Sequence, residues 1–230
     1  MNLSFQLEEK TGKREISLEI KGAVLCGYTG RNQEAVRRHI EELKKEGVKP
    51  PPSVPMFYPK PAQGVAFDGD MYVQGRETSG EIEYVLLVHP KGVWVGLGSD
   101  HTDRELERLD ILKSKQVCPT IISRSLWNYD EIKEHWDKIE IRSWATREDK
   151  KVLYQESSLA TILPPGELMR LVQQKVRGSL EGIAIYSGTL PLKTGEIVFA
   201  DRFEGELYDP VLKKKLTFHY PIYTLSWFRD

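Results

Sequence analysis

The chain has 230 residues, and this length favours one domain with one substantial hydrophobic core. Hydrophobic residues at 40% and charged residues at 29% argue against disordered and collagen-like classes. The 33 basic and 34 acidic residues leave a formal net charge of -1, which offers a nucleic-acid backbone no electrostatic attraction. No apolar run approaches the ~18 residues needed to span a bilayer, so we expect neither a nucleic-acid nor a membrane partner.

The two cysteines, Cys26 and Cys118, lie far apart and have no CxxC spacing. This usage indicates neither a disulfide framework nor a thiolate metal site. Charged residues occur throughout the first 20 positions, which is unlike an export signal. The sequence therefore predicts a cytoplasmic protein.

The chain is predicted to begin in β structure. Residues 3–25 alternate loosely as two short strands, and the polar stretch 9–13 between them contains a glycine suited to a hairpin turn. We expect this hairpin, residues 1–23, to pack on a single domain that spans residues 1–230.

An amphipathic helix is predicted next, from Asn32 to Gly47. Val36, Ile40 and Leu43 repeat at helical spacing and form one apolar face. Asn32 is a suitable N-cap, and Gly47 is a suitable C-terminal stop. The prolines that follow cannot continue the helix, so the chain should run extended along the surface there.

Strands are predicted for most of the remaining chain. They are interrupted by a helix after Thr102, where Glu105 has the spacing of a capping box and Leu106 and Leu109 continue one apolar face. The other strand-like segments and short helices are expected at 64–73, 81–89, 93–98, 130–137 (helix), 166–176 (helix) and 182–227. The fold class is therefore α+β and mainly β.

Two acidic residues alternate in one predicted strand. The period of two places Glu81 and Glu83 on one face, with Ile82 and Tyr84 on the other. Like charges at this spacing repel each other, and a hard cation between them relieves the repulsion. Oxygen ligands favour Mg²⁺, Mn²⁺ or Ca²⁺. The alternative is the polar face of an amphipathic strand that faces solvent.

Asp100 lies between a predicted strand and a predicted helix, where ligand residues often occur. It could supply a third oxygen ligand. The alternative is that Asp100 or Thr102 caps the helix by accepting backbone hydrogen bonds.

His39 and Glu42 are three residues apart on the predicted helix and share one face. A neutral histidine can take a proton from water, and a neighbouring carboxylate would orient its ring. The alternative is a structural role, in which His39 is partly buried and a neighbouring acid is its hydrogen-bond partner.

Several short motifs occur in one order along the chain, and in that order they resemble the fumarylacetoacetate hydrolase (FAH) superfamily. The resemblance spans about residues 24–198. Within the superfamily, the motif at 99–107 is similar to that of a bacterial branch without an assigned activity. The motifs are His39-Ile40-Glu41-Glu42, Pro55-Met56-Phe57-Tyr58-Pro59-Lys60, Glu81-Ile82-Glu83, Ser99-Asp100-His101-Thr102-Asp103-Arg104-Glu105-Leu106-Glu107, Lys113-Ser114-Lys115-Gln116-Val117-Cys118-Pro119 and Leu192-Lys193-Thr194-Gly195-Glu196-Ile197.

The resemblance implies a single catalytic domain with a mixed β-roll or sandwich and a few short helices. It implies that a metal ion, Mg²⁺ or else Mn²⁺ or Ca²⁺, is held by the carboxylates Glu81, Glu83 and Asp100. It also implies substrate contacts from Arg104 and from a lysine, Lys115 or Lys113. His39 and Glu42 would then handle the proton.

The implied activity is hydrolysis of a carbon-carbon bond in a small 2-oxo or 1,3-diketo acid, through an enolate that the metal stabilises. One alternative is a metal-dependent decarboxylase, dehydratase or tautomerase of a 2-oxo acid, which could be derived from a sugar. A second is a binding domain without catalysis. The resemblance further implies a homodimer. The exposed aromatic residues expected near the C-terminus, Tyr220, Tyr223, Trp227 and Phe228, could form its interface; the alternative is that they pack as part of an ordinary edge strand.

Three departures from the family pattern are visible. The segment between Glu83 and Asp100 is short, so a helix that is common there should be missing. The stretch 200–203 lacks the family's Thr-Gly-Thr-Pro turn, and Glu107 stands where glutamine is usual. We therefore expect a substrate different from that of the enzyme that gives the superfamily its name.

Overall fold

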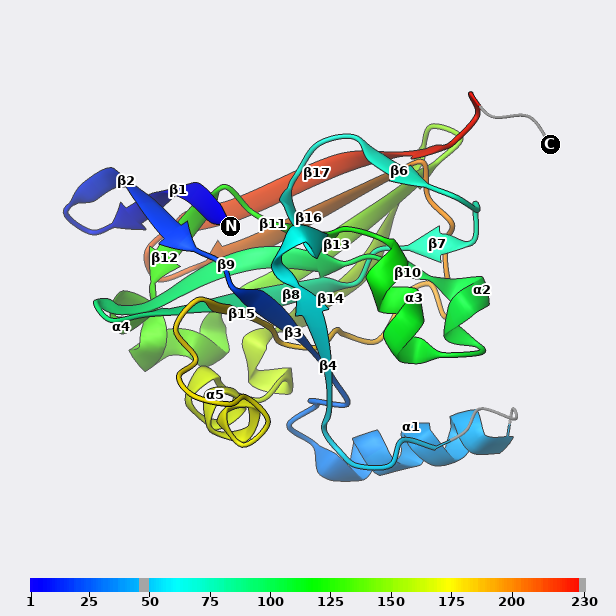
Figure 1. Cartoon of the computed structure of the whole chain (residues 1–230), viewed down its shortest axis with the longest axis horizontal. Helices are drawn as coiled ribbons and strands as arrows, with labels where there is room; N and C mark the ends of the chain where they lie inside the picture. Colours follow the sequence, from blue (N-terminus) through cyan, green and yellow to red (C-terminus); the bar gives the residue numbers. More distant parts are fainter. Residues whose placement is uncertain (46–49, 228–230) are drawn as a thin grey trace.

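The computed structural model describes residues 1–45 and 50–227, except for a few side chains in the first long helix. Its largest element is a mixed sheet of ten strands (Figure 1). These strands are β1 (Asn2–Glu9), β2 (Gly12–Glu19), β3 (Gly22–Gly27), β4 (Met56–Pro61), β5 (Val65–Phe67), β8 (Ile82–His89), β9 (Gly92–Asp100), β11 (Thr120–Ile122), β12 (Ser125–Asn128) and β15 (Ile183–Tyr186). The main path is β2-β1-β12-β9-β8-β15-β3-β4, with β11 pairing with both β9 and β5.

A second sheet of five strands has the order β14-β13-β16-β17-β6, and β7 pairs with β10 in a ladder of two strands. The bounds of these strands are β6 (Met71–Val73), β7 (Thr78–Ser79), β10 (Thr102–Asp103), β13 (Glu140–Arg147), β14 (Lys150–Ser158), β16 (Arg202–Asp209) and β17 (Lys214–Thr224). The fold is thus α+β with a predominance of strand, as the sequence predicts.

The helices are short and lie around the sheets. They are α1 (Gln33–Lys45), α2 (Arg104–Glu107), α3 (Ile111–Val117), α4 (Tyr129–Ile132) and α5 (Pro165–Gln173), with the 3-10 turns η1 (Ala62–Gly64), η2 (Lys133–Lys138) and η3 (Leu159–Thr161). Figure 1 shows α2 and α3 together at one end of the molecule and α4 towards the other, while α1 lies along the lower side.

The N-terminal half confirms several predictions. The hairpin β1–β2 forms, and β1 joins the large sheet by pairing in parallel with β12. Helix α1 starts as expected, because Asn32 Oδ1 accepts hydrogen bonds from the backbone N–H groups of Glu34 and Ala35, both at 3.1 Å. The expected stop at Gly47 lies outside the described residues.

Strand β8 is buried on both faces, and this contradicts the reading of an amphipathic strand that faces solvent. Tyr84 and Leu86 belong to one hydrophobic cluster, which the five-stranded sheet helps to form. Val85 and Leu87 belong to a second cluster on the opposite face, which the N-terminal hairpin covers. Because β8 lies between two cores, any carboxylate on it is removed from water.

The helix predicted after Thr102 is shorter and starts later than expected. Residues 102 and 103 pair with β7 as a strand, so the N-cap is Asp103, whose Oδ1 accepts the N–H of Leu106 at 2.9 Å. Thr102 Oγ1 instead donates to the Asp100 carbonyl at 3.3 Å. Leu109 is 84% exposed rather than part of an apolar face, because α2 ends at Glu107.

Candidate metal centre

The carboxylates of Glu81, Glu83 and Asp100 meet at one end of the β8–β9 hairpin. The two strands pair so that Glu83 lies opposite Gly98, and the Asp100 N–H donates to the Glu81 carbonyl at 3.0 Å. One oxygen from each acid lies within 4.8 Å of the others. The prediction that Glu81 and Glu83 point the same way is confirmed, and the expected absence of a helix between Glu83 and Asp100 is confirmed by the tight turn of the hairpin.

The three acids differ in how far they are removed from solvent. Glu83 is 1% exposed and Asp100 is fully buried, while the Glu81 side chain keeps 18% of its surface exposed. Glu83 Oε2 accepts the Gly188 N–H at 2.7 Å, so the loop after β15 fixes this carboxylate from the side. The cluster is therefore a buried site that opens towards solvent at Glu81.

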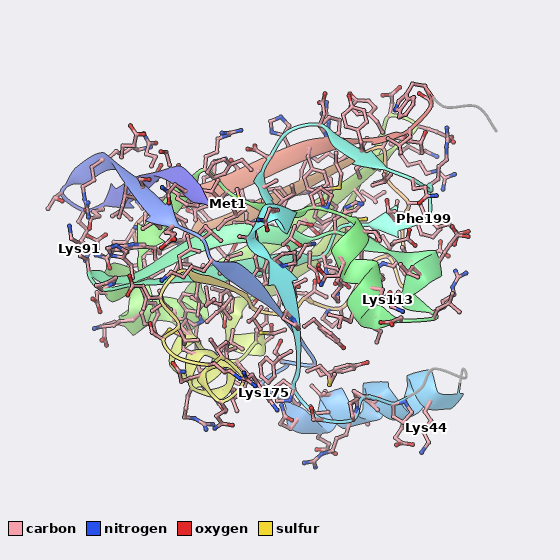
Figure 2. All side chains as sticks on the ribbon, in the orientation of Figure 1. Met1, Lys44, Lys91, Lys113, Lys175 and Phe199 are labelled. Atoms are coloured by element: carbon pink, nitrogen blue, oxygen red, sulfur yellow. The ribbon has the colours of Figure 1, made fainter. Side chains whose placement is uncertain are left out.

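Two cations lie against the carboxylates. Lys115 Nζ is 2.5 Å from Asp100 Oδ2 and 3.3 Å from Glu81 Oε2. Arg104 Nη2 is 3.1 Å from Glu81 Oε1. Lys115 is buried, whereas Lys113 is exposed on the outer side of α3 and pairs with Asp110 (Figure 2). Of the two candidate lysines, Lys115 is the one that the fold brings to the carboxylates.

Arg104 is held by three groups at once. Its Nε donates to Ser79 Oγ at 2.8 Å, and its Nη1 lies 2.7 Å from Glu107 Oε2. With Nη2 on Glu81, all three guanidinium nitrogens contact protein oxygens. The short strand pair β7–β10 makes this possible, since it places Ser79 beside the start of α2.

Burial and the neighbouring charges set a different ionisation for each acid. Burial would raise the pKa of Glu81, but Lys115 and Arg104 outweigh it and lower this pKa to about 2. Burial, reinforced by the charges of Asp100 and Glu81, raises the pKa of Glu83 well above its usual range. Burial also raises the pKa of Asp100, against the effect of Lys115. The site is thus short of positive charge around Glu83.

The donor set fits a hard divalent cation. Asp100 Oδ1 is buried and, among the described residues, has no hydrogen-bond partner. A buried carboxylate oxygen without a partner is costly, and coordination of a cation would satisfy it. All the candidate ligand atoms are carboxylate oxygens, which suit Mg²⁺, Mn²⁺ or Ca²⁺ better than zinc.

A second lysine, Lys60 on β4, lies directly behind Lys115. Its Nζ donates to the carbonyls of Lys115 and Cys118 at 2.5 and 2.6 Å and to Thr120 Oγ1 at 2.6 Å. Burial lowers the pKa of Lys60 to about 8. Lys60 thus binds the C-terminal end of α3 and fixes the backbone that carries Lys115.

The strand end that carries Asp100 is also supported from the five-stranded sheet. The Tyr220 hydroxyl lies 2.9 Å from Ser99 Oγ and 3.0 Å from His101 Nδ1. Tyr220 is fully buried, so the expectation that it forms part of an exposed aromatic surface is wrong. Burial lowers the pKa of His101 to about 3, and the ring is therefore a neutral structural partner.

The sequence assigned no site role to two tyrosines near the carboxylates, although Tyr58 lies within the motif at 55–60. Tyr28 has a φ of 59°, which is uncommon outside glycine, and Tyr58 lies with its ring centroid 5.9 Å from Lys115 Nζ. Burial raises the pKa of both phenols, and the charges of Glu107, Glu81 and Lys115 act on both. The proximity of these residues depends on tertiary structure, which no local pattern reveals.

The side chains of His39 and Glu42 lie outside the described part of the structure, although the α1 backbone that carries them is described. Their predicted role in proton transfer therefore remains a prediction. Phe228, one of the aromatic residues expected at a dimer surface, also lies outside the described residues.

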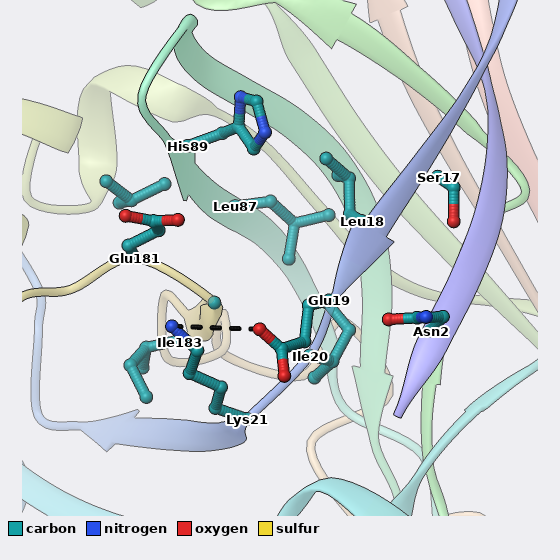
Figure 3. Close-up of a pocket in the computed structure, with 12 residues that line it drawn as sticks. Asn2, Ser17, Leu18, Glu19, Ile20, Lys21, Leu87, His89, Glu181 and Ile183 are labelled. Carbon is teal, nitrogen blue, oxygen red and sulfur yellow. Dashed lines mark ion pairs between the residues drawn. The ribbon is translucent and has the colours of Figure 1, made fainter.

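A surface pocket of about 280 Å³ lies away from the carboxylates (Figure 3). It is bordered by the ends of β2 and β8 and the start of β15, and Lys21 and Glu19 form an ion pair of 3.8 Å across it. None of the carboxylates or cations described above lines this pocket.

Within residues 1–45 and 50–227, no helix is long and apolar enough to cross a membrane.

The family comparison covers most of the chain. A family described as "Protein of unknown function (DUF2848)" matches residues 26–220. The chain belongs to the DUF2848 family. No curated protein matches this DUF2848 sequence. The carboxylates, Arg104, Lys115 and Lys60 all lie inside the family region.

Solved structures resemble this DUF2848 protein over nearly its whole length. A crystal structure of Cg1458 has a TM-score of 0.65 at 16% identity and covers 93% of this chain and 80% of that chain. The apo form of 2-keto-3-deoxy-D-arabinonate dehydratase has a TM-score of 0.62 at 14% identity, with 95% and 78% covered. The dehydratase complexed with magnesium and 2,5-dioxopentanoate has a TM-score of 0.59 at 15% identity, with 93% and 76% covered. The likeness is one of fold, and it confirms the expected FAH-like architecture.

Proposed function

We propose that this protein is a metal-dependent enzyme of the FAH superfamily that acts on a small 2-oxo acid. The observation that carries the proposal is the convergence of three carboxylates, with Lys115 and Arg104 beside them; one buried oxygen, Asp100 Oδ1, has no hydrogen-bond partner within the described part of the chain. Glu81, Glu83 and Asp100 would hold the cation, for which Mg²⁺ is the first choice and Mn²⁺ or Ca²⁺ the alternatives. The magnesium complex of the structurally similar dehydratase supports this choice.

The bound cation would supply Lewis-acid polarisation of the 2-oxo carboxylate group. Lys115 lies within contact of two of the proposed ligands, and its pKa stays above the usual range because Asp100 and Glu81 outweigh the effect of burial. It is therefore a permanent cation that can offset negative charge as it develops on the substrate. Arg104 orients Glu81 and adds a second fixed positive charge at the opening of the site.

Two reactions use this arrangement. One is dehydration or another lyase reaction of a 2-oxo acid, and the likeness to 2-keto-3-deoxy-D-arabinonate dehydratase favours it. The other is hydrolysis of a carbon-carbon bond, in which His39 with Glu42 would activate water. The products distinguish the two, because hydrolysis divides the carbon skeleton into two acids whereas dehydration leaves it whole.

Thermal unfolding of metal-stripped protein with added Mg²⁺ or Mn²⁺ tests the proposed centre. A ligand at 100 times its Kd stabilises the native state by about 2.7 kcal/mol, and we expect a rise in Tm of several degrees. Oxalate, a stable mimic of a 2-oxo acid, should increase the rise further because it chelates the bound cation. Glu83→Gln should abolish both shifts, and its metal-free Tm should equal or exceed that of the wild type, since the change removes a buried acid from a crowd of like charges.

Glu105→Gln is the matched control, because Glu105 is exposed on α2 and lies outside the cluster. It should respond to Mg²⁺ and oxalate as the wild type does. A wild-type Tm that is unchanged by Mg²⁺, by Mn²⁺ and, in a third titration, by Ca²⁺ would contradict the metal centre and leave a binding domain as the better description.

We also propose that two copies of the chain associate. Tyr72 and Tyr223 are 54% and 46% exposed on the paired strands β6 and β17, and their ring centroids are 5.6 Å apart. Leu225 and Trp227, 38% and 77% exposed, extend this aromatic edge. Such a group of apolar side chains is typical of a protein interface.

Two buried free cysteines suit a reducing compartment, so we retain the cytoplasm as the proposed location.

A further inference from the structure

The pairing of Arg104 with Glu107 has a consequence for the substrate. The two residues are three apart on α2, and their 2.7 Å ion pair lies at the opening of the site. The Arg104 side chain is 8% exposed and that of Glu107 28%. The other two guanidinium nitrogens are already occupied by Ser79 and Glu81. Because Glu107 and Glu81 each pair with one terminal nitrogen, a substrate carboxylate that approached this guanidinium in bidentate fashion would have to compete with both of them.

The charge of Glu107 also acts beyond Arg104. It is the largest charge effect on the Tyr28 phenol, and it acts on the Tyr58 phenol and the Lys115 ammonium as well. These three groups belong to the β3–α1 segment, β4 and α3, so the charge of Glu107 reaches side chains from three separate elements. A negative charge is therefore fixed beside Arg104, on the partly exposed side of the proposed metal ligands.

The balance of charge in the site leaves room for one substrate carboxylate. Four acids, Glu107 and the three proposed ligands, are matched by three cations: Arg104 and Lys115 contact the acids, and Lys60 lies behind Lys115. A divalent cation leaves a single positive charge in excess, which the 2-oxo carboxylate of one substrate would neutralise. A second carboxylate would enter a neutral site and would meet Glu107.

We propose that Glu107 determines specificity: by occupying Arg104 and placing a negative charge at the entrance, it restricts the site to 2-oxo monocarboxylates with an uncharged tail and rejects 2-oxo dicarboxylates. The inference rests on the proposed function, because it assumes a metal-bound 2-oxo acid. The phenols of Tyr28 and Tyr58, on which the charge of Glu107 acts, are uncharged hydrogen-bonding groups and suit an uncharged and polar tail.

Calorimetric titration with 2-oxopentanoate and 2-oxoglutarate, at saturating Mg²⁺, tests the inference. These stable acids have equal chain length, and the second differs by a terminal carboxylate. The wild type should prefer 2-oxopentanoate. Glu107→Gln should shift the ratio of the two Kd values towards 2-oxoglutarate on the order of 10-fold, the effect expected from removing one charge several ångströms away in a partly buried site. Glu107→Ala should shift it in the same direction.

The control is Glu105→Gln, which removes an equal charge from the exposed side of the same short helix and should change the ratio by less than about 2-fold. An unchanged ratio in Glu107→Gln overturns the inference, and so does an equal shift in Glu105→Gln. The rise in Tm of the same proteins with Mg²⁺ and oxalate shows whether only the role of Glu107 is wrong or the proposed function as well. If oxalate binds while the ratio stays constant, only the role of Glu107 is wrong; if oxalate does not bind, the proposed function is wrong as well.

Discussion

Lys60 shows how a single side chain can support the centre without touching the proposed ligands. It is 4% exposed and gives its three donors to two carbonyls at the end of α3 and to Thr120. Its folded-state pKa of about 8 lies below the ordinary value of 10.5 because burial disfavours the charged form. The positive charge that fixes Lys115 therefore carries a cost, and this cost depends on pH.

Chemical denaturation between pH 7 and 10 should reveal this cost. Below about pH 8 Lys60 is protonated in both the folded and the unfolded chain and adds no pH dependence. From about pH 8 to 10.5 only the unfolded chain keeps the proton, so the contribution of Lys60 to the free energy of unfolding rises with pH. The difference between wild type and Lys60→Met should increase by up to about 2 kcal/mol by pH 10.

Lys113→Met serves as the control, since Lys113 is exposed on α3, whose C-terminal end Lys60 binds. Its difference from the wild type should stay constant over this pH range. If the difference in free energy of unfolding between wild type and Lys60→Met also stayed constant, burial would not lower the pKa of Lys60 in the folded protein.

Individual residues differ in how far the sequence could predict them. The strand period of two predicts that Glu81 and Glu83 share a face, and the order of motifs that resembles the FAH superfamily adds Asp100 to them; the structure brings the three acids together. The Lys60 contacts, the bond of the Tyr220 hydroxyl to Ser99 and the Gly188 N–H on Glu83 join residues 55 to 121 positions apart, and no local pattern encodes such pairings. Exposure at Tyr220 was predicted wrongly because a strand buried by a second sheet has the same aromatic content as an edge strand.

At the scale of elements, β9 delivers Asp100 through a tightly packed segment. Strand β9 pairs with β8 on one side and with β11 and β12 on the other. A Cβ atom at Gly98 would lie 2.6 Å from the Ile121 carbonyl oxygen and 2.7 Å from Tyr186 Cε1. Gly98 therefore lets the strands approach each other directly beside Glu83.

Gly98→Ala should destabilise the protein by about 1–3 kcal/mol, the usual cost of overpacking a buried site. The displaced strand should also weaken stabilisation by Mg²⁺, because Asp100 follows two residues later. Urea denaturation with and without Mg²⁺ measures both effects.

Gly96→Ala is the comparison, since its Cβ would meet only side-chain atoms of Leu126 and Ile122, the nearest at 3.0 Å. It should cost less than Gly98→Ala. If the two variants lost equal stability and equal stabilisation by Mg²⁺, a glycine at position 98 would have no special role in positioning Asp100.

The predicted elements were most accurate where periodicity and caps agreed. The hairpin β1–β2 and helix α1 with its Asn32 cap have such agreement. The segment after Asp100 does not, since the capping box at Thr102 competes with a strand pairing to β7 that involves residues more than 20 positions earlier. The pairing with β7 overrides the capping box at Thr102, and Asp103 caps the helix instead.

At the scale of the whole molecule, the aromatic edge around Tyr72 and Tyr223 predicts self-association. Size-exclusion chromatography with light scattering should give a mass of about twice 26.4 kDa. The double change Tyr72→Ser and Tyr223→Ser should move the mass towards that of a single chain, because it removes the exposed rings from β6 and β17.

Val152→Ser is the control, since Val152 is 38% exposed on β14, at the opposite edge of the same sheet. It should leave the mass unchanged. A single-chain mass for the wild type at high protein concentration would contradict the proposed dimer.

The hairpin that carries the carboxylates has a further consequence, for the order of folding. All three proposed ligands lie within residues 81–100, on two strands joined by a tight turn. Closing so short a segment costs little chain entropy, so these ligands can assemble as a local contact. The Gly188 N–H and the Tyr220 hydroxyl come from residues that are synthesised after this hairpin. A growing chain can therefore present its carboxylates to a cation first and close the two cores around them afterwards.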